Sequence, residues 1–225
     1  MLAGNPVYEF RDTWEARVIN RPNRFIVETD SGPCHLHDPG RLLDLIYPGN
    51  KVLVRKSGGG ATRCRVTAAW SWDGGEWVVV DSGIHSDIAS KFLPSGSRRE
   101  VRVGRHRLDF AFDDAYVEVK GCTLAVGGRA LFPDAPTRRG AEHMELLARL
   151  RREGRRGIAF ILVMRRATCF APNWGMDPRF SAAFREAVDS GVEVWVKRFG
   201  LRGSELVYGG DLDLCPDWRR EHNVY

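Results

Sequence analysis

Three charged residues that suit metal and phosphate chemistry lie close together in one short part of the chain. Glu118 follows Asp109 by nine positions, and Lys120 follows Glu118 by two. Mg²⁺ prefers oxygen ligands and is often held by only one or two carboxylates together with water and phosphate oxygens. A lysine beside them can orient a water molecule or stabilise the charge that develops at phosphorus. The combination predicts catalytic residues for phosphodiester hydrolysis, with Mg²⁺ or Mn²⁺ as cofactor.

The hydrophobic pattern around these residues indicates two adjacent strands of a β-hairpin. A two-residue turn at 113–114 would place Asp109 opposite Glu118 and Arg107 opposite Lys120. Facing carboxylates have Cβ atoms about 4.5–5.5 Å apart and repel each other unless a cation lies between them. The alternative is an exposed face whose charges alternate only because water wets it. The apolar positions, which a one-residue slip would move to the other face, are Leu108, Phe110, Phe112, Val117 and Val119.

The elements that would hold this hairpin fall into two groups. Residues 1–82 contain short alternating segments separated by Gly- and Pro-rich turns, a pattern typical of a small β-barrel or sandwich. Residues 83–225 contain several strands and then alternating helices and strands, with helices expected at 137–153 and 178–190. This order predicts an α/β (α+β) fold, in which a small β domain precedes a mixed sheet flanked by helices.

The charge distribution favours a polyanionic partner for the second half of the chain. Residues 1–82 carry 10 basic and 10 acidic side chains, so the formal charge of +5 lies entirely within 83–225. Of the 34 basic residues 29 are arginine, whose planar guanidinium suits phosphate. A solvated surface is the alternative reading of the same arginines. Motifs for nucleotide hydrolysis and dinucleotide binding do not occur in the sequence.

The sequence also favours a cytoplasmic location. The five cysteines are far apart and form no C-x-x-C pair, which argues against a disulfide framework and for a reducing compartment. The N-terminus lacks a basic segment followed by an apolar stretch, so no secretory signal is expected. Apolar runs are all shorter than the roughly 18 residues that cross a bilayer, so no membrane association is expected.

Four further segments support the hairpin assignment by resemblance. Together with the Asp/Glu-x-Lys set, they resemble the sugar fermentation stimulation protein A family over nearly the whole chain. The resemblance implies an OB-like domain at 1–82, a PD-(D/E)XK nuclease-like domain at 83–225, and DNA as the partner. The segments are RPNRF at 21–25, HLHDPGRL at 35–42, EVKGCTL at 118–124 and FPDAPTRRGAEH at 132–143.

Several other residues are candidates for the same site. Glu100 could supply a third carboxylate to the metal, or it could be a surface residue between arginines. Thr137 is a natural helix N-cap, and the Arg139 and His143 side chains one turn apart would favour a phosphate at the helix start. The alternative is an ordinary cap, a solvated arginine and a packed histidine. The predicted nucleic-acid contacts are Arg24, Arg41, Arg107, Thr137, Arg139 and His143.

Three functions remain open at this stage. The first is a Mg²⁺-dependent deoxyribonuclease, and the second is a non-catalytic DNA-binding regulator of sugar metabolism genes that retains the nuclease-like fold. The third is an OB-domain interaction protein whose hairpin carboxylates are incidental. Aromatic residues at Trp70, Trp72 and Trp77 could stack bases, although alternating aromatics in a barrel are more often core. The oligomeric state stays open, a homodimer included.

Overall fold

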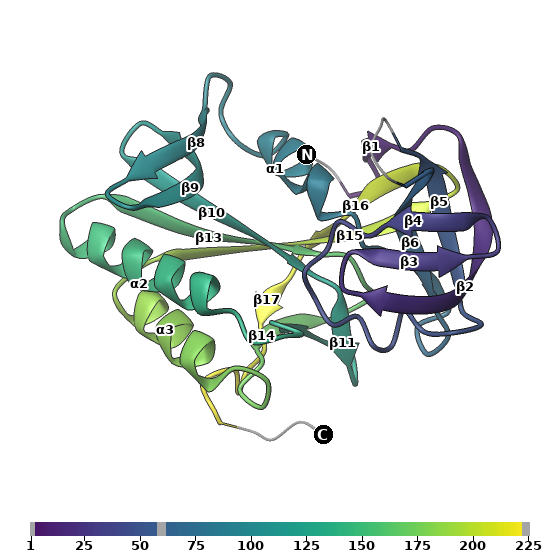
Figure 1. Cartoon of the computed structure of the whole chain (residues 1–225). Coiled ribbons are helices and arrows are strands. Elements are labelled where there is room, and N and C mark those ends of the chain that lie inside the picture. The colour runs from purple at the N-terminus through teal and green to yellow at the C-terminus, as the bar shows by residue number, and fades with distance from the viewer. Residues whose placement is uncertain (1–2, 58–61, 222–225) are drawn as a thin grey trace.

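The computed structural model describes residues 3–57 and 62–221 and shows two β-rich units packed together (Figure 1). An N-terminal barrel lies beside a twisted sheet, and helices α2 (Arg138–Arg152) and α3 (Pro178–Asp189) cover one face of that sheet. Helix α1 (His85–Ser90) packs on the opposite face. The α/β fold class predicted from the sequence, with an OB-like barrel followed by a mixed sheet flanked by helices, is confirmed.

The barrel is formed by β2–β6, with β7 added to it. Its strands follow the order β4-β3-β2-β5-β6-β7, and an additional pairing of β4 with β6 closes it. Side chains alternate between interior and surface, so that Val52 and Val54 are fully buried while their neighbours are half-buried. The strands are β2 (Thr13–Asn23), β3 (Ile26–Thr29), β4 (Gly32–His35), β5 (Lys51–Lys56), β6 (Cys64–Ser71) and β7 (Glu76–Val79).

The large sheet has seven strands in the order β1-β16-β15-β13-β10-β9-β8. Strands β10, β13 and β15 run parallel to one another at its centre. Because both faces of the sheet are covered, β13 is almost uniformly apolar and buried. The strands are β1 (Pro6–Glu9), β8 (Arg98–Val103), β9 (His106–Phe112), β10 (Ala115–Cys122), β13 (Arg156–Val163), β15 (Glu193–Arg202) and β16 (Glu205–Asp211).

The N-terminal strand departs from the division at residue 82 that the sequence predicts. Strand β1 pairs antiparallel with β16 and thereby extends the large sheet instead of the barrel. One hydrophobic cluster also continues from the barrel interior, including Val52 and Val66, to the sheet face that carries Phe110 and Phe160. The two units therefore share part of their core. In the described parts of the chain, no helix is both long and apolar enough to cross a membrane.

Both long helices begin and end where the sequence predicts them to within one residue. The Thr137 side chain accepts a hydrogen bond from the Gly140 N–H and caps α2, as expected. Asp177 caps α3 in the same way and also accepts the N–H of Thr137 at 2.7 Å. One aspartate thus ties the starts of the two helices together, which fixes the N-terminus of α2 relative to α3.

A second, smaller sheet beside the helices was not anticipated from the sequence. It has four strands in the order β11-β12-β14-β17. These strands are too short to show a reliable alternation in the sequence. They are β11 (Leu124–Val126), β12 (Arg129–Phe132), β14 (Cys169–Pro172) and β17 (Asp213–Leu214).

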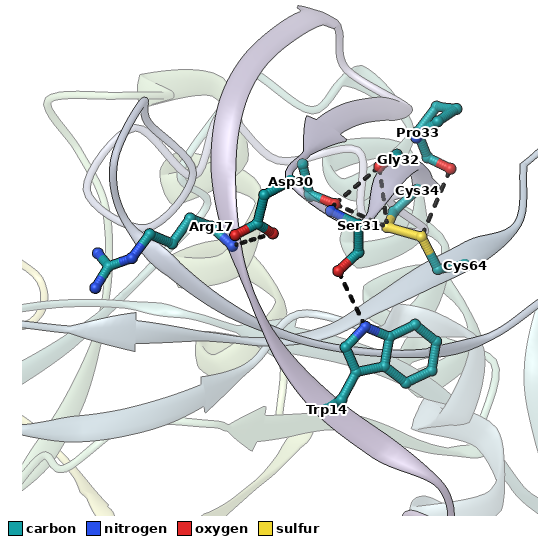
Figure 2. The surroundings of a disulfide bond; sticks show 9 residues. Trp14, Arg17, Asp30, Ser31, Gly32, Pro33, Cys34 and Cys64 are labelled. Carbon is teal, nitrogen blue, oxygen red and sulfur yellow. Dashed lines mark hydrogen bonds between the residues drawn. A yellow bond between two sulfur atoms is a disulfide. The ribbon is translucent and has the colours of Figure 1, made fainter.

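Two disulfide bonds contradict the expectation that the cysteines are unpaired. Cys34 is bonded to Cys64 (Figure 2). Cys169 is bonded to Cys215. The spacing along the chain hides the first pair, because Cys34 and Cys64 become register partners only when β4 meets β6. Cys215 directly follows β17, and the pairing of β17 with β14 brings it close to Cys169. The argument from cysteine spacing to a reducing compartment therefore fails.

A buried arginine joins the barrel to the large sheet. Arg165, directly after β13, has only 2 % of its side chain exposed. Its guanidinium donates to Asp44 and to Asp73, and Nη2 also donates to the Ser71 hydroxyl. All three partners belong to the barrel or its loops, so this residue adds a polar link to the shared core of the two units.

Candidate active site

The hairpin forms with the predicted register next to its turn. Ala115 pairs with Phe112, and Val117 pairs with Phe110. Beyond this point, a side chain replaces the backbone as the hydrogen-bond acceptor: Oδ2 of Asp109 accepts the Val119 N–H at 2.7 Å. The Asp109 side chain is thereby held against β10, in the stretch that carries Glu118.

The predicted apolar face of β9 is interrupted at Asp109. Phe110 lies in the cluster shared with the barrel, whereas Leu108 lies in the cluster beneath α2. On the neighbouring strand β8, Glu100 has a left-handed φ of 52° and is skipped in the pairing of β8 with β9. The register of β8 against β9 is the same on both sides of Glu100, so the irregular backbone of β8 lies beside the point where β9 changes face between Phe110 and Leu108.

Glu118 is the most deeply buried charged residue of the hairpin, with 3 % of its surface exposed. Its Oε1 accepts from Lys120 Nζ at 2.5 Å and also contacts Nδ1 of His143 on α2. Its Oε2 is buried and has no hydrogen-bond partner among the described residues. One oxygen is therefore held firmly, while the other offers an unused lone pair to a cation.

The two carboxylates differ in their affinity for protons. Burial, and then the negative charge of Glu118, raise the pKa of Asp109 to about 6. Burial alone would also raise the pKa of Glu118, but Lys120 and His143 outweigh it and hold that pKa below its usual range. Glu118 is therefore ionised at neutral pH, and Asp109 is close enough to sense its charge.

A cleft of about 530 Å³ opens beside Lys120, between the barrel and the start of α2. Arg24 lines it from the barrel, and Thr137 and Arg139 line it from the helix. Arg139 Nε donates to His143 Nε2 at 3.4 Å, so the helix start is connected through His143 to Glu118. Four of the residues predicted from the sequence thus line one cleft: Arg24, Lys120, Thr137 and Arg139. Glu118 and His143 are outside this lining but are in contact with Lys120 and Arg139, respectively.

Three of the predicted residues lie elsewhere. Glu100 is exposed and forms an ion pair with Arg107, which is also exposed, at 3.0 Å. Arg41 is exposed, and its carbonyl oxygen accepts from Arg21. Among the described residues, these three are not part of the cleft lining. The roles assigned to them remain predictions that the geometry does not support.

Sequence reasoning missed the contacts between two loops that line the cleft, those of Gly40 and Asp134. Asp134 accepts the Leu42 N–H at 3.1 Å, and a Cβ on Gly40 would lie 2.4 Å from the Asp134 carboxylate. Only glycine therefore allows the barrel loop to approach the loop before α2 this closely. The Asp-Pro-Gly and Phe-Pro-Asp segments were the available signal, but nothing in the sequence shows that they meet.

Replacing Asp38, which also lines the cleft, by Asn is expected to stabilise the protein above pH 7 by up to about 4 kcal/mol, the cost of ionising a carboxyl group whose pKa is raised by about three units. Burial raises the pKa of Asp38 to about 7. Since the folded-state pKa lies above the unfolded one, the stability that this group contributes falls as the pH rises from about 4 to 7. Asn retains the oxygen that accepts the Gly40 N–H at 2.8 Å.

Chemical denaturation of both proteins at pH 4 and pH 8 checks this expectation. The stability gain should be present at pH 8 and absent at pH 4. An equal difference at both pH values would show that ionisation of Asp38 does not oppose folding.

The site fits a divalent cation with few protein ligands. In residues 3–57 and 62–221, no group of three or more His, Cys, Asp or Glu side chains is arranged to hold a metal ion. A cation at Asp109 and Glu118 would therefore take its other ligands from water and substrate phosphate, which is the usual situation for Mg²⁺. The unused Glu118 Oε2 and the repulsion between the two carboxylates agree with such a site.

Two family models together match most of the chain. The SfsA N-terminal OB domain matches residues 19–80, and the Sugar fermentation stimulation protein RE domain matches residues 78–205. A solved structure described as Pyrococcus furiosus SfsA in complex with Ca²⁺ has a TM-score of 0.85 and 25% sequence identity. The match covers 94% of this chain and 100% of that chain.

Relatives of known name extend the similarity over nearly the full length. A sugar fermentation stimulation protein homolog of Sulfurisphaera tokodaii is 54% identical over 212 residues, which is 93% of either chain. The homolog of Sulfolobus acidocaldarius is 54% identical over 215 residues, 94% of either chain. The chain belongs to the sugar fermentation stimulation protein family.

Proposed function

We propose that this protein binds DNA and hydrolyses its phosphodiester bonds with a divalent cation, Mg²⁺ or Mn²⁺, at Asp109 and Glu118. The observation that carries the proposal is the buried, unpartnered Oε2 of Glu118 beside a second carboxylate whose pKa is raised. The Ca²⁺ complex described for the Pyrococcus furiosus relative supports a divalent cation in this family. Such a cation would polarise the phosphate and lower the pKa of a bound water.

The side chains of this protein have distinct tasks in the proposal. Lys120 lines the cleft and is held by Glu118, so its ammonium group can bind a phosphate oxygen and stabilise the charge that develops there. His143 contacts the same Glu118 oxygen from α2 and keeps the carboxylate in place. Thr137 and Arg139 mark the N-terminus of α2, where backbone N–H groups favour a neighbouring phosphate.

A non-catalytic DNA-binding regulator is the second candidate. It is favoured by the burial of Glu118, which has 3% of its surface exposed, and by the position of Asp109 and Glu118 outside the lining of the cleft that the structure describes.

The two disulfides do not decide the compartment, because intracellular proteins of hyperthermophiles also contain them. A cytoplasmic location remains part of the proposal.

Calorimetric titration with Mn²⁺ tests the proposed site without relying on activity. One site per chain is expected for the metal-free protein, and its affinity should drop sharply in Asp109→Asn and in Glu118→Gln. Glu100→Gln is the matched control, since Glu100 is exposed and paired with Arg107. Unchanged affinity in both site variants would place the cation elsewhere.

DNA binding is expected to weaken steeply with salt. If about five phosphates are neutralised, log K should fall against log salt with a slope of about −4 to −5. Arg139→Ala should reduce the magnitude of the slope by about 1 and lower affinity for different sequences alike, because a phosphate contact carries no base information. Arg149→Ala, at the far end of α2, is the control. A slope near zero would contradict electrostatic binding.

A further inference from the structure

A second hollow of about 410 Å³ opens on the barrel next to the cleft that contains Lys120. It shares Asp38, Pro39 and Ser82 with the lining of that cleft, so the two adjoin each other. We call it the Phe25 groove. Its lining residues are Phe25, His35, His37, Asp38, Pro39 and Ser82.

Aromatic rings form the wall of the Phe25 groove. Phe25 lies in the turn between β2 and β3 and is 46% exposed, although the Arg24 guanidinium lies 5.2 Å from its ring centroid. The His35 and His37 rings lie with their centroids 5.7 Å apart. An exposed aromatic residue inside a hollow, beside an arginine, has the chemistry that binds the flat face of a nucleobase.

The barrel holds the backbone segments that carry these rings next to one another. The Phe25 carbonyl oxygen accepts the Leu36 N–H at 2.8 Å, which places the turn beside the segment that carries both histidines. His37 Nδ1 lies 3.1 Å from the Ser82 hydroxyl, and the Ser82 N–H donates to the His37 carbonyl oxygen. The backbone around the groove is therefore preformed, which lowers the cost of ordering this segment on binding.

A metal ion does not account for this pair of histidines. Within the described ranges, no cluster of metal-binding side chains includes His35, His37 or Asp38. Burial raises the pKa of Asp38 to about 7, so that carboxyl group offers a hydrogen bond to a polar ligand with less repulsion of a nearby phosphate. The groove instead suits a ligand with an aromatic body and polar edges.

We propose that the Phe25 groove binds an unpaired nucleobase of the DNA strand whose phosphate lies at Lys120, so that the protein acts on single-stranded DNA. This inference rests on the proposed function. A base within a duplex has both faces stacked, and only an unpaired or extruded base can enter such a groove. Because the groove and the cleft adjoin at Asp38, Pro39 and Ser82, one strand can occupy both.

The sequence suggests the tryptophans of the barrel as the residues that could stack bases, whereas the proposed base-binding surface is the Phe25 groove. Trp70 and Trp77 are half-buried and pack edge-on, with ring centroids 5.3 Å apart. Trp72 is 62% exposed, but in the described part of the chain it lines neither the groove nor the cleft. Trp72 therefore provides an exposed aromatic control on the same barrel.

The test compares the affinity of Phe25→Ala, Phe25→Tyr and Trp72→Ala for single-stranded DNA and for a blunt duplex of the same sequence, in EDTA. Phe25→Ala is expected to weaken single-strand binding about tenfold or more, because one stacked base contributes roughly that much. Duplex binding should change less than about twofold. Phe25→Tyr should restore single-strand affinity, and Trp72→Ala should leave it unchanged.

The outcomes separate this inference from the proposed function. Binding of single strands that is insensitive to Phe25→Ala, or equally sensitive to Trp72→Ala, would overturn the groove while leaving DNA binding intact. Equal losses for single strands and duplex would also overturn it. If the wild-type protein binds neither form of DNA, the proposed function fails and the groove assignment fails with it.

Discussion

Replacing Glu118 by Gln is expected to lower the rate of Mg²⁺-dependent DNA cleavage on the order of a thousandfold or more, while metal-free DNA affinity stays within about twofold. The amide oxygen can still accept from Lys120 and contact His143, so the fold should persist. The lost charge removes one of the very few protein ligands available to the cation. Phosphate binding should not suffer, since a negative charge disappears from the site.

The control for this variant is Glu145→Gln. Glu145 is on the same helix as His143, but it pairs with the exposed Arg179, and neither residue lines the cleft that the structure describes. Cleavage rates of both variants should be compared with affinities measured in EDTA. If Glu118→Gln cleaves as fast as the wild-type protein, the activity belongs to another site or another protein.

Removing the charges of both Asp44 and Asp73 is expected to destabilise the protein by about 3–5 kcal/mol. The two carboxylates are 41% and 69% exposed, whereas the Arg165 side chain that they neutralise is 2% exposed. Asp44→Asn combined with Asp73→Asn would therefore leave a buried guanidinium without a counter-charge from its two ion-pair partners. The free energy of unfolding from chemical denaturation measures the cost.

Replacing the other partner of these ion pairs, Arg165, provides the control. Arg165→Met removes the buried charge itself and leaves two aspartates that water can still reach, so a smaller loss of stability is expected. A larger loss for Arg165→Met than for the double variant would mean that packing by the arginine stem, and not its charge, joins the barrel to the sheet.

Local features of the fold could be predicted because neighbouring residues determine them. The hairpin register near its turn follows from alternating apolar residues, and the start of α2 follows from the Thr137 cap. Contacts between distant segments left no comparable signal. The Cys34–Cys64 disulfide depends on β4 meeting β6, and β1 depends on the open edge that β16 provides.

In the candidate site, too, the features set by neighbouring residues could be predicted and the contacts between distant segments could not. Asp109, Glu118 and Lys120 could be singled out because strand periodicity and the resemblance agree on them. His143 was named through the resemblance, but its contact with Glu118 requires α2 to pack on β10. The loop contacts of Gly40 with Asp134 join segments about ninety residues apart, and no local pattern predicts them.

The most direct test of the central claim is a cleavage assay of the wild-type protein on labelled single-stranded, tailed and blunt double-stranded DNA, in Mg²⁺ and in EDTA, at concentrations that saturate binding. The account predicts cleavage in Mg²⁺, preferentially of strands with unpaired bases, and intact DNA in EDTA. Saturated binding without cleavage of any of these structures in Mg²⁺ or Mn²⁺ would contradict it and leave the non-catalytic DNA-binding protein as the explanation.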